Sequence, residues 1–132
     1  MSSSAKRILI VDDENDNVYL FALILEDGGY LVDTYTSPGL ALAEYKPNYY
    51  DMMIFDYRMA DLNGLELYQR IRAIDKSARA MLLTAGHEQL TLDENNKLFL
   101  RVLGKPIHAT TLLNEVASVL NQADSLPNIL IP

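Results

Sequence analysis

The sequence contains no cysteine among its 132 residues. Disulfide bridges and thiolate metal sites are therefore excluded, and the absence fits a cytoplasmic protein. Long apolar runs are also missing, because the longest one, residues 18–25, falls far short of the roughly 18 residues that span a membrane. The first residues lack the charged, apolar and small-residue segments of a signal peptide. We therefore expect a cytoplasmic protein that makes no use of a membrane.

Positive charge is scarce as well. The 11 Lys and Arg residues face 18 Asp and Glu residues, which gives a net charge of −7. Because an acidic surface repels nucleic-acid phosphates, direct binding of DNA or RNA is not expected. What the chain does have is apolar residues, at 49% of the total, in a length suited to one globular domain.

Strand-like and helix-like segments alternate along the chain. Residues 8–11 and 52–55 are continuous apolar runs, which is typical of strands buried on both faces. Further strands are predicted at residues 30–36, 80–84 and 101–103, and helices at residues 18–25, 38–46, 65–74, 87–100 and 110–121. This alternation predicts an α/β fold, a doubly wound (βα)5 arrangement in which right-handed crossovers join five parallel strands.

Reactive side chains stand where four of these strands end. They are Asp12 and Asp13 after the first strand, Asp56 after the third, Thr84 at the fourth and Lys105 at the fifth. In an open α/β sheet, ligands bind beyond the carboxyl ends of the strands. Each of these signals alone is ordinary, since an Asp pair often caps a helix and a lysine often lies in a solvated loop. Together they predict one crevice with three carboxylates, a hydroxyl and an ammonium group.

Three carboxylates in one crevice repel each other unless a cation lies among them. With only hard oxygen ligands available, Mg²⁺ is the cation that fits best. A carboxylate can also attack phosphorus and form an aspartyl phosphate. Phosphoryl transfer asks little more of a protein than positioning and electrostatic stabilisation.

The motifs together resemble those of a known family. Residues 6–14 (KRILIVDDE), Asp56 followed by Met59 and Gly64, Thr84-Ala85 and Lys105-Pro106 resemble the receiver domain of response regulators. The resemblance covers roughly residues 6–122 and implies the flavodoxin-like strand order 2-1-3-4-5. It divides the chain into an extension (1–5), a receiver domain (6–122) and a C-terminal tail or linker stub (123–132).

The resemblance also implies a role for each matching residue. Asp56 would accept a phosphoryl group from a histidine kinase or a histidine phosphotransfer protein. Asp12, Asp13 and Asp56 would hold Mg²⁺ with the backbone carbonyl of Arg58, while Thr84 and Lys105 would contact phosphoryl oxygens. The Lys105-Pro106 bond would be cis, as X–Pro bonds can be at small cost. Such a module catalyses only its own phosphorylation and dephosphorylation, and it signals to a downstream protein partner or to an output domain missing from this chain through residues 87–121.

The sequence departs from the family pattern at several positions. Ala60 stands where proline is common, and Val102 stands where an aromatic residue usually reports the phosphorylated state. Arg58 and Gly86 occupy the variable positions that tune dephosphorylation in this family. Because Val102 has no ring to swing behind Thr84, another residue would have to report phosphorylation.

Two other functions compete with the phosphorylation switch. The departures at Ala60 and Val102 suggest a degenerate receiver that binds proteins without phosphorylation, although the complete acidic set argues against it. A phosphohydrolase would need an acid two residues after its nucleophile to protonate the leaving group, and Arg58 occupies that place. Neither His87 nor His108 has a companion at metal-ligand spacing, so no metal or relay role is expected for them.

Overall fold

The computed structural model describes residues 5–85 and 99–130, and the side chains that it describes end at residue 121. Five strands form one parallel sheet in the order β2-β1-β3-β4-β5. The strands are β1 (Arg7–Val11), β2 (Leu31–Tyr35), β3 (Met52–Asp56), β4 (Ala80–Ala85) and β5 (Arg101–Lys105). The order predicted from the family resemblance is therefore confirmed.

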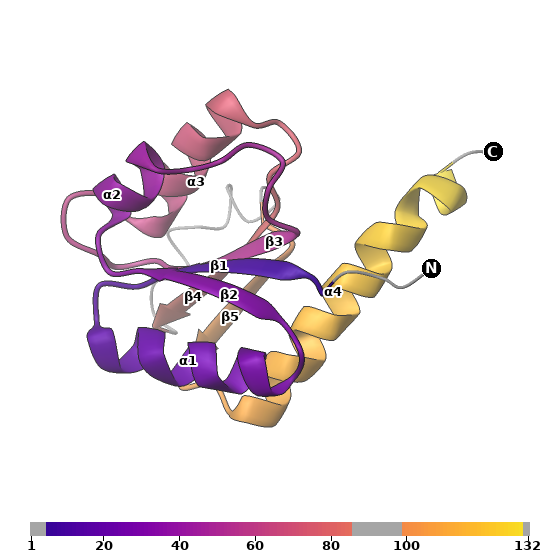
Figure 1. The fold of residues 1–132 in the computed structure, drawn as a ribbon, viewed down its shortest axis with the longest axis horizontal. Helices are drawn as coiled ribbons and strands as arrows, with labels where there is room; N and C mark the ends of the chain where they lie inside the picture. The colour runs from indigo at the N-terminus through magenta and orange to yellow at the C-terminus, as the bar shows by residue number, and fades with distance from the viewer. Residues whose placement is uncertain (1–4, 86–98, 131–132) are drawn as a thin grey trace.

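Helices cover both faces of the sheet (Figure 1). They are α1 (Asn15–Asp27), α2 (Pro38–Ala43), α3 (Gly64–Ile74) and α4 (Ala109–Leu130). Helices α1 and α4 lie on one face, and α2 and α3 lie on the other (Figure 1). Among the helices described, none combines the length and the apolarity that crossing a membrane requires.

The apolar core consists of two clusters separated by the sheet. Alternate residues of β1 serve the two sides, so that Leu9 packs under α2 and α3 while Ile8 packs under α1 and α4. Every residue of β3 is buried, which is why its sequence is continuously apolar up to Asp56. The central strands therefore hold the side chains at their carboxyl ends on a rigid support.

Two predicted helix ends and the predicted burial of one residue differ from the structure. Helix α2 ends at Ala43 instead of near residue 46, and α4 continues past residue 121 to Leu130. Ile74, predicted on the apolar face of its helix, is 56% exposed because it is the last residue of α3. The helix predicted at residues 87–100 falls almost wholly outside the described residues.

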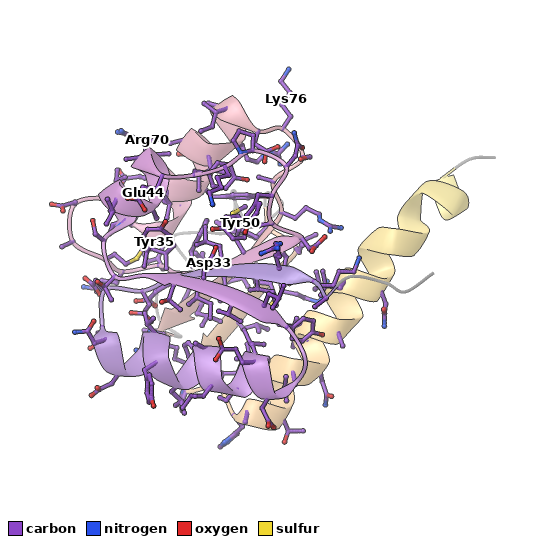
Figure 2. All side chains as sticks on the ribbon, in the orientation of Figure 1. Asp33, Tyr35, Glu44, Tyr50, Arg70 and Lys76 are labelled. Carbon is purple, nitrogen blue, oxygen red and sulfur yellow. The ribbon has the colours of Figure 1, made fainter. Side chains whose placement is uncertain are left out.

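Two tyrosine–carboxylate hydrogen bonds link the edge strand β2 to residues that follow α2. The Tyr50 hydroxyl donates to Asp33 and the Tyr35 hydroxyl donates to Glu44, both at 2.7 Å (Figure 2). Burial is the main cause that raises the pKa of Tyr50, with its bond to Asp33 second. These hydroxyl–carboxylate pairs connect the edge strand β2 to the chain around α2.

Asp75 ties together the loops at the amino ends of the strands, far from the reactive residues. Its carboxylate accepts hydrogen bonds from the Tyr45 hydroxyl (2.6 Å), the Asn48 amide (3.0 Å) and both the amide and the hydroxyl of Ser77 (3.1 and 2.6 Å). Burial opposes its ionisation, but these donors outweigh burial and lower the pKa of Asp75 to about 2.

Candidate functional site

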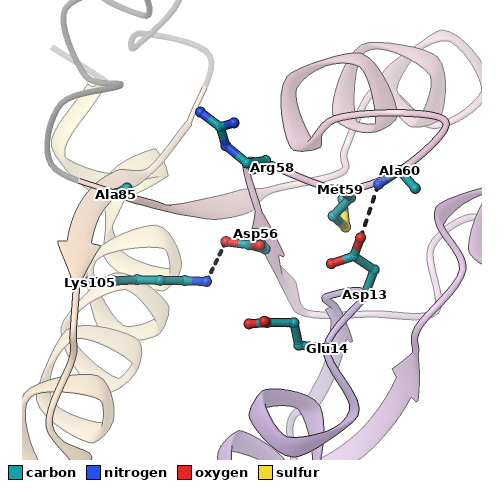
Figure 3. A pocket seen from close by; sticks show the side chains of 8 residues that line it. All are labelled: Asp13, Glu14, Asp56, Arg58, Met59, Ala60, Ala85 and Lys105. Carbon is teal, nitrogen blue, oxygen red and sulfur yellow. Dashed lines mark hydrogen bonds and ion pairs between the residues drawn. The ribbon is translucent and has the colours of Figure 1, made fainter.

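The reactive side chains meet at the carboxyl edge of the sheet. Asp12 directly follows β1, Asp56 ends β3 and Lys105 ends β5. Thr84 belongs to β4, between them, where it pairs with Gly104 of β5. A cleft of about 450 Å³ opens at this edge (Figure 3), lined by Asp13, Glu14, Asp56, Arg58, Met59, Ala60, Ala85 and Lys105.

Three carboxylates converge in this cleft. Asp12, Asp13 and Asp56 each offer one oxygen, and these oxygens all lie within 4.8 Å of one another. Asp12 and Asp56 are buried, whereas Asp13 is exposed. Such a set of hard oxygen donors suits a small divalent cation such as Mg²⁺.

Each of the two carboxylates next to β1 has one oxygen held by a backbone amide. The Glu14 amide donates to Asp12 Oδ1 at 3.0 Å, and the Ala60 amide donates to Asp13 Oδ2 at 3.0 Å (Figure 3 shows the second bond). The other oxygen of Asp12, Oδ2, is buried and has no hydrogen-bond partner among the described residues. A buried acceptor without a partner carries a desolvation cost, and a bound cation would remove it.

Lys105 reaches into the same space. Its Nζ lies 2.7 Å from Asp56 Oδ1 and 3.8 Å from Asp12 Oδ2 (Figure 3 shows the pair with Asp56). Burial lowers the pKa of Lys105, but the bond to Asp56 and the nearby carboxylates outweigh burial and leave that pKa raised. The ammonium group is therefore charged and available to an anion that comes to Asp56.

Burial and crowding make ionisation of Asp56 costly. Its pKa is raised to about 6, mainly by burial, and the charges of Asp12 and Asp13 raise it further, while Lys105 lowers it. The pKa of Asp12 is also raised, again chiefly by burial. The raised pKa values of Asp12 and Asp56 mean that the protein alone does not fully stabilise the two carboxylates in their charged form. A bound cation would stabilise that form.

Two further groups complete the surroundings of Asp56. The Thr84 hydroxyl is fully buried, and no partner for Oγ1 is found in the part of the chain that the structure describes. Gly64, at the start of α3, approaches the Asp56 carbonyl so closely that a Cβ there would lie 2.5 Å from that oxygen. Glycine at residue 64 is thus a steric requirement for the position of Asp56.

The structure places the predicted site residues Asp12, Asp13, Asp56, Thr84 and Lys105 at one edge, and the Lys105-Pro106 bond is cis. The Arg58 side chain lines the cleft. Gly86 and His87 lie outside the described residues. Val102 is half-buried and packs against the cluster beneath α2 and α3.

Sequence reasoning missed two contributors to the cleft. Glu14 belongs to the motif at residues 6–14, but its place in the lining could not be read from the motif. The second is the Ala60 amide, which donates to Asp13. The sequence indicates that this donor exists, because residue 60 is alanine and not proline, which has no amide hydrogen.

Comparisons with known proteins agree on the family. The model of the response regulator receiver domain matches residues 8–117. The response regulator receiver protein CpdR of Brucella abortus is 29% identical over 116 residues, which cover 87% of this chain and 97% of CpdR. A response regulator receiver protein of Anaeromyxobacter is 36% identical over 110 residues, 83% of this chain and 46% of that protein.

Among solved structures, the response regulator protein TrrA of Thermotoga maritima, in complex with Mg²⁺–BeF, superimposes with a TM-score of 0.76 at 31% identity. The match covers 86% of this chain and 98% of TrrA. A receiver domain protein from Clostridium thermocellum gives a TM-score of 0.81 at 25% identity, over 92% and 98% of the two chains.

The fold and the acidic cleft define a doubly wound α/β domain with three carboxylates and a lysine at the carboxyl ends of its strands. The chain belongs to the response regulator receiver domain family. It is therefore a receiver domain of two-component signal transduction, a class of signalling modules rather than of enzymes with substrates of their own. Receiver domains bind Mg²⁺ at an acidic pocket and work with histidine kinases and output domains.

Proposed function

We propose that this chain is a magnesium-dependent switch that accepts a phosphoryl group on Asp56. The observation that carries the proposal is the cleft itself, where three carboxylate oxygens lie within 4.8 Å of one another and Lys105 Nζ lies 2.7 Å from Asp56. Two buried oxygens beside them, Asp12 Oδ2 and Thr84 Oγ1, have no hydrogen-bond partner among the described residues, and Lys105 Nζ lies 3.8 Å from the first. A cation and a phosphoryl group would satisfy both.

In this proposal Asp12, Asp13 and Asp56 hold Mg²⁺, together with the backbone carbonyl of Arg58. The similarity to TrrA, which was crystallised with Mg²⁺–BeF, supports the binding of Mg²⁺ by this chain. The ion supplies positive charge that offsets the repulsion between the carboxylates and an incoming phosphoryl group.

The chain's own residues carry the transfer. A carboxylate oxygen of Asp56 forms the new O–P bond while the P–N bond to the donor's histidine breaks, and the electron pair returns to the imidazole. Lys105 Nζ, now paired with Asp56 Oδ1, moves its contact to a phosphoryl oxygen, and the Thr84 hydroxyl donates to another. These new bonds draw the ends of β4 and β5 toward the phosphoryl group.

The partners follow from this chemistry. A histidine kinase or a histidine phosphotransfer protein supplies the phosphoryl group. The response is read by a downstream protein or by an output domain, through the surface that includes β5 and α4. We assign the switch to residues 6–122, with residues 1–5 as an extension and residues 123–132 as a C-terminal tail or linker stub.

The test is intact-mass analysis after incubation with acetyl phosphate, with Mg²⁺ or with a chelator. We expect one phosphoryl group, added only when Mg²⁺ is present and lost in Asp56→Asn. Asp61→Asn is the matched control, because Asp61 lies in the same loop, is exposed and takes the positive φ that Asn tolerates. If no donor modifies the wild-type protein, the degenerate receiver that binds partners without phosphorylation replaces this proposal.

A further inference from the structure

The loop between β3 and α3 reaches across the cleft to a residue that follows β1. The Ala60 amide donates to Asp13 Oδ2 at 3.0 Å. Figure 3 shows this bond and also shows the second oxygen of Asp13 turned into the space in front of Asp56. Asp13 is exposed, so without this bond its carboxylate could rotate among several rotamers.

The Ala60 peptide is itself held on both sides. The carbonyl of Ala60 accepts a hydrogen bond from the Leu62 amide at 2.8 Å, which closes a three-residue turn around Asp61. Asp61 has φ 72, a conformation that L residues other than Asn and Asp rarely adopt. On the other side, Met59 is buried in the core beneath α2 and α3. The donor is therefore presented from a rigid loop.

A carboxylate whose outer oxygen is held leaves its inner oxygen aimed at the cleft. We propose that the Ala60 backbone amide is a positioning group for Mg²⁺ binding, because it orients Asp13 before the ion arrives. This inference rests on the proposed function, in which Asp13 is a ligand of Mg²⁺. Pre-orientation strengthens binding because less side-chain freedom is lost when the ion binds. A proline at residue 60 has no amide hydrogen and could not do this.

The test compares Ala60→Pro with Ala60→Ser. Proline removes the donor, whereas serine keeps it at an exposed position that has room for a hydroxyl. The measurements are Mg²⁺ binding to the unphosphorylated protein by isothermal titration calorimetry and the rate of phosphorylation by acetyl phosphate over a Mg²⁺ titration. We expect Ala60→Pro to raise the half-saturating Mg²⁺ concentration about three- to tenfold, the effect of losing one exposed hydrogen bond. The rate at saturating Mg²⁺ should change much less, and Ala60→Ser, which keeps the donor, should raise the half-saturating concentration clearly less than Ala60→Pro does.

A second variant separates the donor from the proline ring. An ester in place of the Met59–Ala60 amide, introduced by semisynthesis, replaces the N–H group by an oxygen and so removes the donor without adding a ring. It should shift the titration in the same direction. Urea unfolding of each variant checks that it is folded. If Ala60→Pro does not fold, the ester variant alone tests the role of the donor.

The outcomes distinguish this inference from the proposed function. If the wild-type protein needs no Mg²⁺ for phosphorylation, the proposed function fails. If the wild type does need Mg²⁺ but the ester and proline variants titrate like it, the positioning role of Ala60 is wrong while the switch stands. An equal shift in Ala60→Ser would also overturn the inference, since that variant retains the donor.

Discussion

Replacing Gly64 by alanine should damage both the stability of the protein and its phosphoacceptor. A Cβ at residue 64 would lie 2.5 Å from the Asp56 carbonyl oxygen, 3.2 Å from the carbonyl carbon and 2.7 Å from a methyl of Leu82. The Leu82 methyl can rotate away, but the carbonyl belongs to β3, which is buried along its whole length. The strand end, and Asp56 with it, must therefore move.

Overpacking of this kind costs about 1–3 kcal/mol, and the better helix propensity of alanine returns less than about 1 kcal/mol. We expect Gly64→Ala to lower the free energy of unfolding by about 2 kcal/mol and the melting temperature by roughly 5–10 °C. Urea and thermal unfolding followed by circular dichroism measure these changes. The rate of phosphorylation by acetyl phosphate should fall as well, because Asp56 is displaced.

Gly104→Ala is the matched control, since it also adds one methyl group beside the site. A Cβ at Gly104 would have no atom within 4 Å, and its φ is not in the left-handed range. We expect a change within about 0.5 kcal/mol or a small gain, because alanine restricts the unfolded chain. Equal unfolding midpoints for Gly64→Ala and the wild type would refute the steric argument.

Three further predictions concern charge and hydrogen bonding. Because the pKa of Asp56 is raised to about 6 from about 3.9 in an unfolded chain, this group favours the folded state below pH 4 and loses that contribution as the pH rises through 6. In chelator at pH 7, the free energy of unfolding of Asp56→Asn should therefore exceed that of the wild type by about 1–3 kcal/mol, which urea unfolding measures. A lower urea midpoint for the variant would contradict the burial argument. Lys105→Met should slow phosphorylation at saturating Mg²⁺ by at least about tenfold, because a cation 2.7 Å from Asp56 is lost; an unchanged rate would remove Lys105 from the mechanism. Tyr45→Phe should cost about 1 kcal/mol in unfolding experiments yet leave phosphorylation unchanged, since Asp75 keeps its other donors at the opposite end of the sheet.

The strand order was predictable chiefly through the family motifs. Alternating strands and helices indicate a parallel sheet, but periodicity alone does not say which strands are neighbours. The burial of residues at helix ends was harder to predict, as Ile74 illustrates. It continues the apolar spacing of α3, yet the helix ends there and the next residue, Asp75, is buried instead, because four hydrogen bonds at that point satisfy its carboxylate.

The members of the site were predictable because each stands where a strand ends. Their electrostatics were not, because the raised pKa of Asp56 depends on burial and on which neighbours its carboxylate meets. The bond from Ala60 to Asp13 was also beyond sequence reasoning, since it joins backbone to side chain across 47 residues. The sequence shows that a donor is present at residue 60, and only the fold shows where that donor points.

The buried oxygens Asp12 Oδ2 and Thr84 Oγ1 have a consequence for how long the protein survives in a cell. Each burdens the folded state with a desolvation cost of about 1–3 kcal/mol. A ligand that satisfies them stabilises the folded state, by about 2.7 kcal/mol at a hundred times its dissociation constant. Because proteases cleave the transiently opened chain, loss of the ligand raises the population open to attack. Occupied copies should therefore outlive unoccupied ones, so that the abundance of the protein follows the state of its own cleft.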